Sequence, residues 1–266
     1  MKQFVLAAAV ALFATSVSAQ AFRKYKISFR TNPNIGWMVP QNNNQEFTGS
    51  SLRFGFGLST DILFTENYAI GTGLNVEGMG GKLSYLTRKT EFAGQPEEAA
   101  YIVEKERNFN LRYVEIPLTL KLRTNEIGYL TYWGQFGLGL GVNWRALADE
   151  TDNYIRVFQE DEDTGNWVTT DKADFNDEAI DVSDEINILR ASLIIGAGVE
   201  YNLSGTTSMV IGLTFNNGFT NVFNRNATGV ERQPENDQPL IGSSGPSEFR
   251  LKSTNNTIGL TLGLLF

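Results

Sequence analysis

The stretch that decides the fold is the last ten residues of the chain, TIGLTLGLLF, numbered 257–266. Large apolar residues stand at positions 258, 260, 262, 264 and 266, and threonine or glycine stands at positions 257, 259, 261 and 263. Successive side chains of a β-strand point to opposite faces of a sheet. This period of two therefore predicts a strand with one apolar face and one face of small residues.

The same alternation recurs along the chain and predicts eight strands. They are expected at residues 24–32, 52–63, 68–78, 111–122, 129–145, 188–202, 208–219 and 254–266. The long connections are residues 33–51, 79–110, 146–187 and 220–253. The short connections are residues 64–67, 123–128 and 203–207. An even strand count with short turns at one end and long loops at the other is typical of an outer-membrane barrel.

The small-residue face indicates which side of the barrel meets its surroundings. Water-facing strands of a soluble barrel would be rich in Lys, Glu and Thr, whereas here the polar face is largely glycine with one or two charges per strand. An eight-stranded barrel has room inside only for side chains, so small residues suit its interior. We therefore predict an all-β fold: an eight-stranded antiparallel transmembrane up-and-down barrel with short periplasmic turns and long extracellular loops. Pro117 cannot donate a ladder hydrogen bond, so we expect a bulge or a broken ladder there.

Composition and the N-terminus narrow the classes of protein. The 266 residues include no Cys and no His, which excludes disulfides, thiolate metal sites and a Ser-His-Asp triad. The formal net charge of −8 makes a nucleic-acid partner unexpected. Lys2, the apolar residues 4–14 and the small residues at 17–19 predict a signal peptide at residues 1–19, cleaved after Ala19. Residues 20–266 would then form a single barrel domain in the outer membrane.

One segment resembles a known family. Residues 113–121, YVEIPLTLK, resemble the Y-x-E-I-P-L strand of the PorT-like outer-membrane β-barrel family of Bacteroidota, a porin-family small barrel. The glycine-rich residues 134–143 and the terminal strand that ends at Phe266 are similar to the same family. The resemblance implies outer-membrane lipid and the barrel-insertion machinery as partners, with Phe266 ending the assembly signal. The founding member of that family is linked to type IX protein secretion, so the resemblance makes a secretion-apparatus partner a further expectation.

Charged residues on the small-residue face are candidate site residues. We expect these side chains in the lumen: Arg53, Asp61, Glu77, Glu115, Lys121, Arg145, Arg190 and Glu200, with Lys26, Arg30 and Arg123 nearby in the pattern. They could form a plug of paired charges, since buried charges are tolerated when partners satisfy them. They could instead line a narrow ion path or a small anion site.

The third long loop is strongly acidic. Between residues 149 and 187 it carries fourteen Asp or Glu residues against Arg156 and Lys172. Asp161 and Asp163, followed by Gly165, have the spacing of a minimal calcium loop. The alternative is a hairpin turn, with residues 154–158 paired to residues 167–170. We expect no cofactor and no catalytic residues.

The expected function is a non-enzymatic, structural or surface-interaction role through the extracellular loops. A narrow passive channel for ions or small solutes is the alternative. An accessory role in secretion is a further alternative, which depends on the family resemblance alone.

Overall fold

The computed structural model describes residues 24–89, 100–158, 175–232, 241–242 and 245–266. The expected signal peptide, Asp161, Asp163 and the turn at residues 163–165 lie outside the described residues. Within the described residues, no helix is long and apolar enough to cross a membrane.

Strands make up nearly all of the regular structure. They are β1 (Tyr25–Pro40), β2 (Gln45–Gly49), β3 (Ser51–Leu63), β4 (Tyr68–Lys89), β5 (Ala100–Arg123), β6 (Leu130–Phe158), β7 (Phe175–Asp181), β8 (Leu189–Ser204), β9 (Thr207–Gly218), β10 (Thr228–Val230), β11 (Ile241–Gly242), β12 (Gly245–Pro246), β13 (Glu248–Arg250) and β14 (Ser253–Leu265). A 3-10 turn, η1 (Ser183–Glu185), precedes β8.

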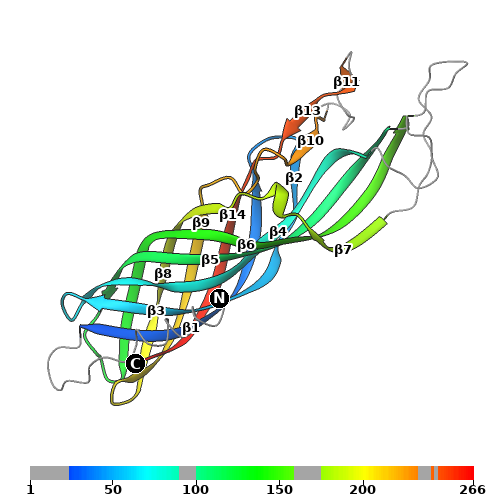
Figure 1. The fold of residues 1–266 in the computed structure, drawn as a ribbon. Coiled ribbons are helices and arrows are strands. Elements are labelled where there is room, and N and C mark those ends of the chain that lie inside the picture. The colour runs from blue at the N-terminus through cyan, green and yellow to red at the C-terminus, as the bar shows by residue number, and fades with distance from the viewer. Residues whose placement is uncertain (1–23, 90–99, 159–174, 233–240, 243–244) are drawn as a thin grey trace, which may run out of the picture.

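Eight of these strands close into a ring. The order is β4-β3-β1-β14-β9-β8-β6-β5, and β5 pairs back to β4. Every pairing in the ring is antiparallel, which makes the protein an eight-stranded up-and-down barrel as predicted. Short turns join β3 to β4, β5 to β6 and β8 to β9 at the end where the chain terminates (Figure 1).

The apolar face points outward, as the alternation predicts. Leu138 and Leu140 on β6 are 49% and 62% exposed, whereas Lys121 on β5 has no exposed surface. The same contrast holds around the ring, with exposed Phe, Leu and Ile on the outside and buried polar groups within. Such an outer surface is the band that contacts acyl chains in a membrane barrel.

Strands β1, β4, β5 and β6 are longer than predicted. Residues 33–40, 79–89, 100–110 and 146–158 were expected in loops, yet they continue the strands. Figure 1 shows β4, β5 and β6 projecting together beyond the barrel, with β7 beside them. Beyond the apolar band the inward positions of these strands carry charged as well as apolar residues, such as Arg107, Glu150 and Phe109. No single period of two in the apolar residues therefore marks these strands in the sequence, although backbone pairing continues.

Pro117 interrupts the β4–β5 pairing, and the register of that pairing is the same on both sides of it. The β4–β5 pairs run through Thr72–Leu118 and resume at Asn75–Glu115, and the ladder is interrupted between them, opposite Pro117. On its other side Pro117 pairs with Gly139 of β6. The predicted local break is therefore confirmed, because the missing N–H affects the bond to one neighbour only.

An apolar cluster lies inside the extracellular end. Strand residues such as Met38, Met79 and Phe109 pack there with Phe223 and Leu251, which belong to the β9–β14 connection. The rings of Phe109 and Phe223 meet edge to face at 5.3 Å. We call this the apolar cap; its other members are Leu83, Tyr85, Leu111, Tyr113, Ala146, Ala148, Val182, Ile186, Val222 and Ala227. The described parts of the β7–β8 and β9–β14 connections thus pack onto the strands.

Two glycines bring β4 against β1 beneath this cap. Gly80 and Gly81 have φ of +147° and +152°, which L side chains rarely adopt. A Cβ on Gly81 would lie 2.7 Å from the backbone of Trp37 and Met38. Glycine is required here because the two backbones touch directly.

Candidate functional site

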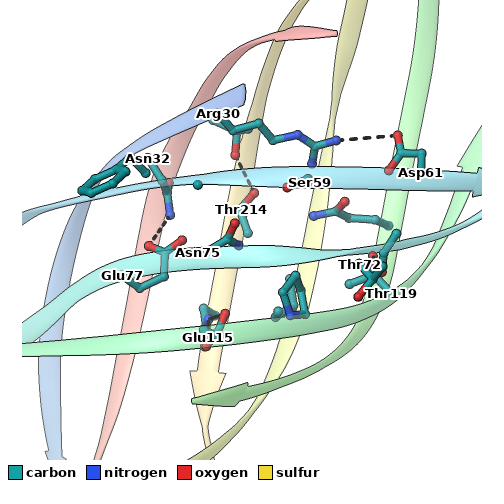
Figure 2. A pocket seen from close by; sticks show the side chains of 18 residues that line it. Arg30, Asn32, Ser59, Asp61, Thr72, Asn75, Glu77, Glu115, Thr119 and Thr214 are labelled. Carbon is teal, nitrogen blue, oxygen red and sulfur yellow. Dashed lines mark hydrogen bonds and ion pairs between the residues drawn. The ribbon is translucent and has the colours of Figure 1, made fainter. Parts of the chain in front are cut away.

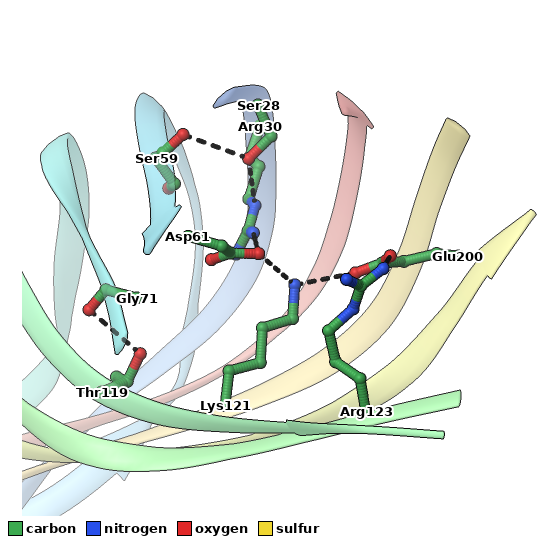
Figure 3. Close-up of polar contacts among 9 residues, drawn as sticks. All are labelled: Ser28, Arg30, Ser59, Asp61, Gly71, Thr119, Lys121, Arg123 and Glu200. Carbon is green, nitrogen blue, oxygen red and sulfur yellow. Dashed lines mark hydrogen bonds and ion pairs between the residues drawn. The ribbon is translucent and has the colours of Figure 1, made fainter. Parts of the chain in front are cut away.

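The part of the lumen nearer the short turns, here called the lower lumen, holds an ion network centred on Lys121. Its ammonium lies 2.6 Å from Asp61 Oδ2 and 2.8 Å from Glu200 Oε1 (Figure 3). Arg123 pairs with the other oxygen of Glu200, and Lys121 lies 5.2 Å from the centre of the Trp133 ring. Strands β3, β5, β6 and β8 each contribute to this network, so it ties opposite walls of the barrel together.

Arg30 on β1 joins the network from the other side. Its guanidinium lies 3.6 Å from Asp61 and its Nε donates to Ser28 Oγ at 2.9 Å (Figure 3). Asp61 therefore faces two cations, Arg30 and Lys121, and the buried carboxylate is compensated. Breaking one partner of such a buried pair leaves an uncompensated charge, which is costly.

A second polar group fills the upper lumen. Arg190 on β8 donates to Glu115 Oε2 at 3.0 Å and to Asn216 Oδ1 at 2.8 Å. Its guanidinium also lies 6.0 Å from the ring centre of Tyr113, a member of the apolar cap. The Arg190 group is thus in contact with the apolar cap. The Arg190 group and the cap together occupy the extracellular end of the lumen.

A small cavity of about 60 Å³ lies between the two groups. Asn32, Glu77, Glu115, Thr119 and Thr214 are among its lining residues (Figure 2). Asn32 donates to Glu77 across it at 3.2 Å. The space can hold a few water molecules.

Six of the eight predicted lumen charges lie inside the barrel. They are Asp61, Glu77, Glu115, Lys121, Arg190 and Glu200, all less than 10% exposed. Arg53 is half-buried and belongs to neither group; its guanidinium donates to Asn108 Oδ1 at 2.8 Å and to the Phe109 carbonyl at 2.6 Å.

Arg145 does not face the lumen, and that prediction is wrong. Between Tyr113–Asn143 and Arg112–Arg145 the β5–β6 register shifts by one residue. Trp144 is the extra residue of this bulge. The inward-facing residues of β6 are therefore Asn143 before the bulge and Ala146 after it, and Arg145 is exposed. A strict period of two cannot anticipate such an insertion.

A third ion network lies beyond the apolar band and was not predicted. Arg107 Nε lies 2.7 Å from Glu150 Oε2, its Nη1 lies 2.5 Å from Glu185 Oε2, and Lys105 pairs with Glu150. Burial favours the neutral form of Glu150 and so raises its pKa. The charges and hydrogen bonds of Arg107 and Lys105 have the larger effect, and they hold the pKa of Glu150 below its usual value. These residues fall in segments that looked like loop, so nothing in the sequence placed them on facing strands.

Metal binding finds no support in the described part of the chain, where no group of three or more acidic residues could hold an ion. Asp161 and Asp163, the candidate calcium ligands, lie outside it. The calcium expectation therefore stays a prediction.

A closed β-ring with an apolar exterior and a charged, filled interior defines a membrane β-barrel. The family model described as outer membrane protein beta-barrel domain matches residues 15–224, and the chain belongs to this family. The protein is accordingly an outer-membrane barrel. No curated protein matches the chain.

Several solved structures are similar to the chain at low identity. Neisserial surface protein A is 9% identical, with a TM-score of 0.42 over 92% of this chain and 98% of that chain. Outer membrane protein OprG from Pseudomonas aeruginosa is 8% identical, with a TM-score of 0.38 over 90% and 95%. Outer membrane protease OmpT from Escherichia coli is 9% identical, with a TM-score of 0.34 over 94% and 99%.

Proposed function

We propose that the protein is a non-enzymatic outer-membrane barrel that acts through its extracellular part, in a structural or surface-interaction role. The observation that carries this proposal is the filled lumen. The Lys121 network, the Arg190 group and the apolar cap follow one another along the barrel axis from the short turns to the loops. In the described residues, paired charges thus occupy the lumen within the band and buried apolar side chains occupy it beyond the band.

The extracellular part offers the surface that such a role needs. Beyond the apolar band the strands continue as a sheet in the order β2-β4-β5-β6-β7. The Arg107 network and the cap hold this sheet and the β9–β14 connection in one arrangement. A rigid, water-facing sheet is suited to contact with a partner outside the cell.

A recording of the purified protein in planar bilayers tests the sealed lumen. We expect no discrete conductance steps from the wild-type protein. The double variant Lys121→Ala, Arg190→Ala removes the central cation of each group, so steps seen only in the variant would indicate that these residues are the seal. Steady single-channel steps from the wild type would overturn the proposal.

A narrow passive channel for ions or small solutes is the second candidate. The cavity beside Glu77 and Glu115 favours it, since charged and polar side chains line a space within the membrane-spanning part. Wild-type conductance that falls when Glu115 is changed to Gln would support it over the sealed barrel.

An accessory role in type IX protein secretion is the third candidate. Its support is the YVEIPLTLK segment and the assignment to the PorT-like barrels of Bacteroidota that this segment suggests. Phe266 would end the signal that the insertion machinery reads. A deletion strain that secretes normally would count against this role.

A further inference from the structure

Two arginines stand directly opposite each other on the outer wall of the barrel. Arg112 on β5 pairs with Arg145 on β6. Their chain neighbours Leu111 and Ala146 are fully buried, so the arginines occupy the outward positions; Arg145 is exposed and Arg112 is half-buried. Side chains directly opposite on antiparallel strands have Cβ atoms about 5 Å apart, and like charges in such a pair repel.

The pair lies at the extracellular edge of the apolar band. Val142 and Trp144, which precede Arg145 on β6, are 48% and 64% exposed. Farther out, the outward residues are Asn110 and Asn108 on β5 and Leu147 and Asp149 on β6, so the outer wall turns mostly polar there. Tryptophan is enriched at the depth of lipid headgroups, so Trp144 places the guanidiniums at that level.

No carboxylate in the described residues forms an ion pair with either guanidinium. The outward side of this sheet carries acids too. Asp149 and Asp181 accept other bonds, and Glu106, farther along β5, pairs with Lys82. Asp149 accepts from the Ala179 N–H at 3.1 Å, and Asp181 accepts from the Ser183 N–H at 2.9 Å. The hydrogen bonds from Ser183 chiefly lower the pKa of Asp181, and the charge of Arg145 contributes last.

The contrast with Arg107 is informative. Arg107 faces inward on the same strand and meets two carboxylates, Glu150 and Glu185. Arg112 and Arg145 face outward and meet none within ion-pair distance in the described residues. On the other flank Arg112 is paired with Gly78 of β4, and Phe54 and Arg53 of β3 lie against this glycine. Arg53 is thus a third cation near Arg112, and its guanidinium already donates to Asn108 and to the Phe109 carbonyl. Arg112 and Arg145 themselves are left without an ion-pair partner in the described residues.

We propose that Arg112 and Arg145 bind the phosphate of an outer-leaflet lipid headgroup. Each guanidinium can donate two parallel hydrogen bonds to phosphate oxygens, and one phosphate between them would convert their repulsion into attraction. A lipid is the source that fits the site, because the pair stands on the lipid-facing wall beside Trp144. The acyl chains of that lipid would lie on the exposed Val142 and Leu140 below.

Binding and stability measurements test this site in the refolded full-length protein. In zwitterionic detergent micelles, purified bis-phosphorylated lipid A is titrated while protein tryptophan fluorescence and thermal unfolding are followed. We expect saturable binding and a rise in melting temperature for the wild type. The variant Arg112→Gln, Arg145→Gln should bind about tenfold or more weakly, since charge-assisted bonds are lost. Arg88→Gln, an exposed arginine farther along β4, serves as the matched control and should bind as the wild type does.

The sign of the stability change gives a second readout. Without phosphorylated lipid, removal of one guanidinium relieves repulsion, so Arg145→Gln should be as stable as the wild type or more stable. With the lipid present, Arg145→Gln should be less stable. Dephosphorylated lipid A and inorganic phosphate are the two comparison ligands, and neither should reproduce the stabilisation. Equal binding by wild type and double variant would overturn the proposal, and so would equal stabilisation by inorganic phosphate.

Discussion

The ammonium of Lys121 lies 2.6 Å from the carboxylate of Asp61, which is 60 residues earlier in the chain and two strands away in the barrel. Strand β4 lies between them, and its inward residues at this level are Ala69 and Gly71, which pair with Lys121 and Asp61 respectively. The two charges can meet because these intervening side chains are small. This pairing explains why a strand that would gain stability from larger residues carries glycine instead.

Lys121→Met should destabilise the barrel strongly. The change leaves Asp61 and Glu200 buried with less compensation, and breaking one partner of a buried ion network costs about 3–5 kcal/mol. Urea unfolding of the protein in lipid vesicles, followed by tryptophan fluorescence, measures the loss. Lys24→Met, at an exposed lysine before β1, should change the free energy of unfolding by less than about 0.5 kcal/mol. Similar small effects for both variants would contradict the network's structural role.

Phe223→Ala should loosen the extracellular end without unfolding the barrel. Phe223 is fully buried in the apolar cap and contacts Phe109, and truncation of a buried phenylalanine costs about 3–5 kcal/mol. Since Phe223 belongs to the β9–β14 connection, we expect faster proteolytic cleavage between β9 and β14. The membrane-embedded strands should stay protected. Unchanged cleavage rates would show that the cap does not hold this connection.

Acidification should weaken the sheet beyond the membrane through Glu150. Its pKa is depressed in the folded protein, so it stabilises the fold above its usual value of 4.5, and this contribution is lost as pH falls through the lower folded value. The difference in melting temperature between the wild type and Glu150→Gln should therefore be largest near pH 7 and shrink below about pH 4.5. A difference that grows on acidification would have the wrong sign.

Leu140→Arg should destabilise the protein in a bilayer. Leu140 is 62% exposed on the outer face of β6, and a charged residue near the midplane of a membrane barrel costs about 2–4 kcal/mol. Thr228→Arg, at an exposed position of β10, is the matched control and should cost little. Equal tolerance of both substitutions in vesicles would argue against a lipid-facing β6.

The sequence was sufficient for the membrane-embedded part of the fold. Residues 257–266 and their counterparts alternate strictly, because each strand has lipid on one side and a packed lumen on the other. That constraint identified all eight strands, the outward apolar face and six lumen charges, Asp61 and Lys121 among them.

The same reasoning failed where the constraint ends. Arg145 follows a bulge that one extra residue, Trp144, introduces, and a periodic pattern does not register it. Beyond the band, Arg107 and Glu150 are brought together by strand pairing that their own sequence does not mark. The apolar cap unites residues from strands and loops, such as Met38 and Phe223, and such contacts depend on the tertiary fold.

The most direct test of the central claim uses the absence of native cysteine. Single cysteines at Leu138 and Thr228 are spin-labelled, and their collisions with oxygen and with a water-soluble nickel chelate are compared in lipid vesicles. A lipid-facing β6 predicts high oxygen and low nickel accessibility at position 138, and the reverse at position 228. High nickel accessibility at position 138 would contradict a barrel whose apolar face is covered by acyl chains.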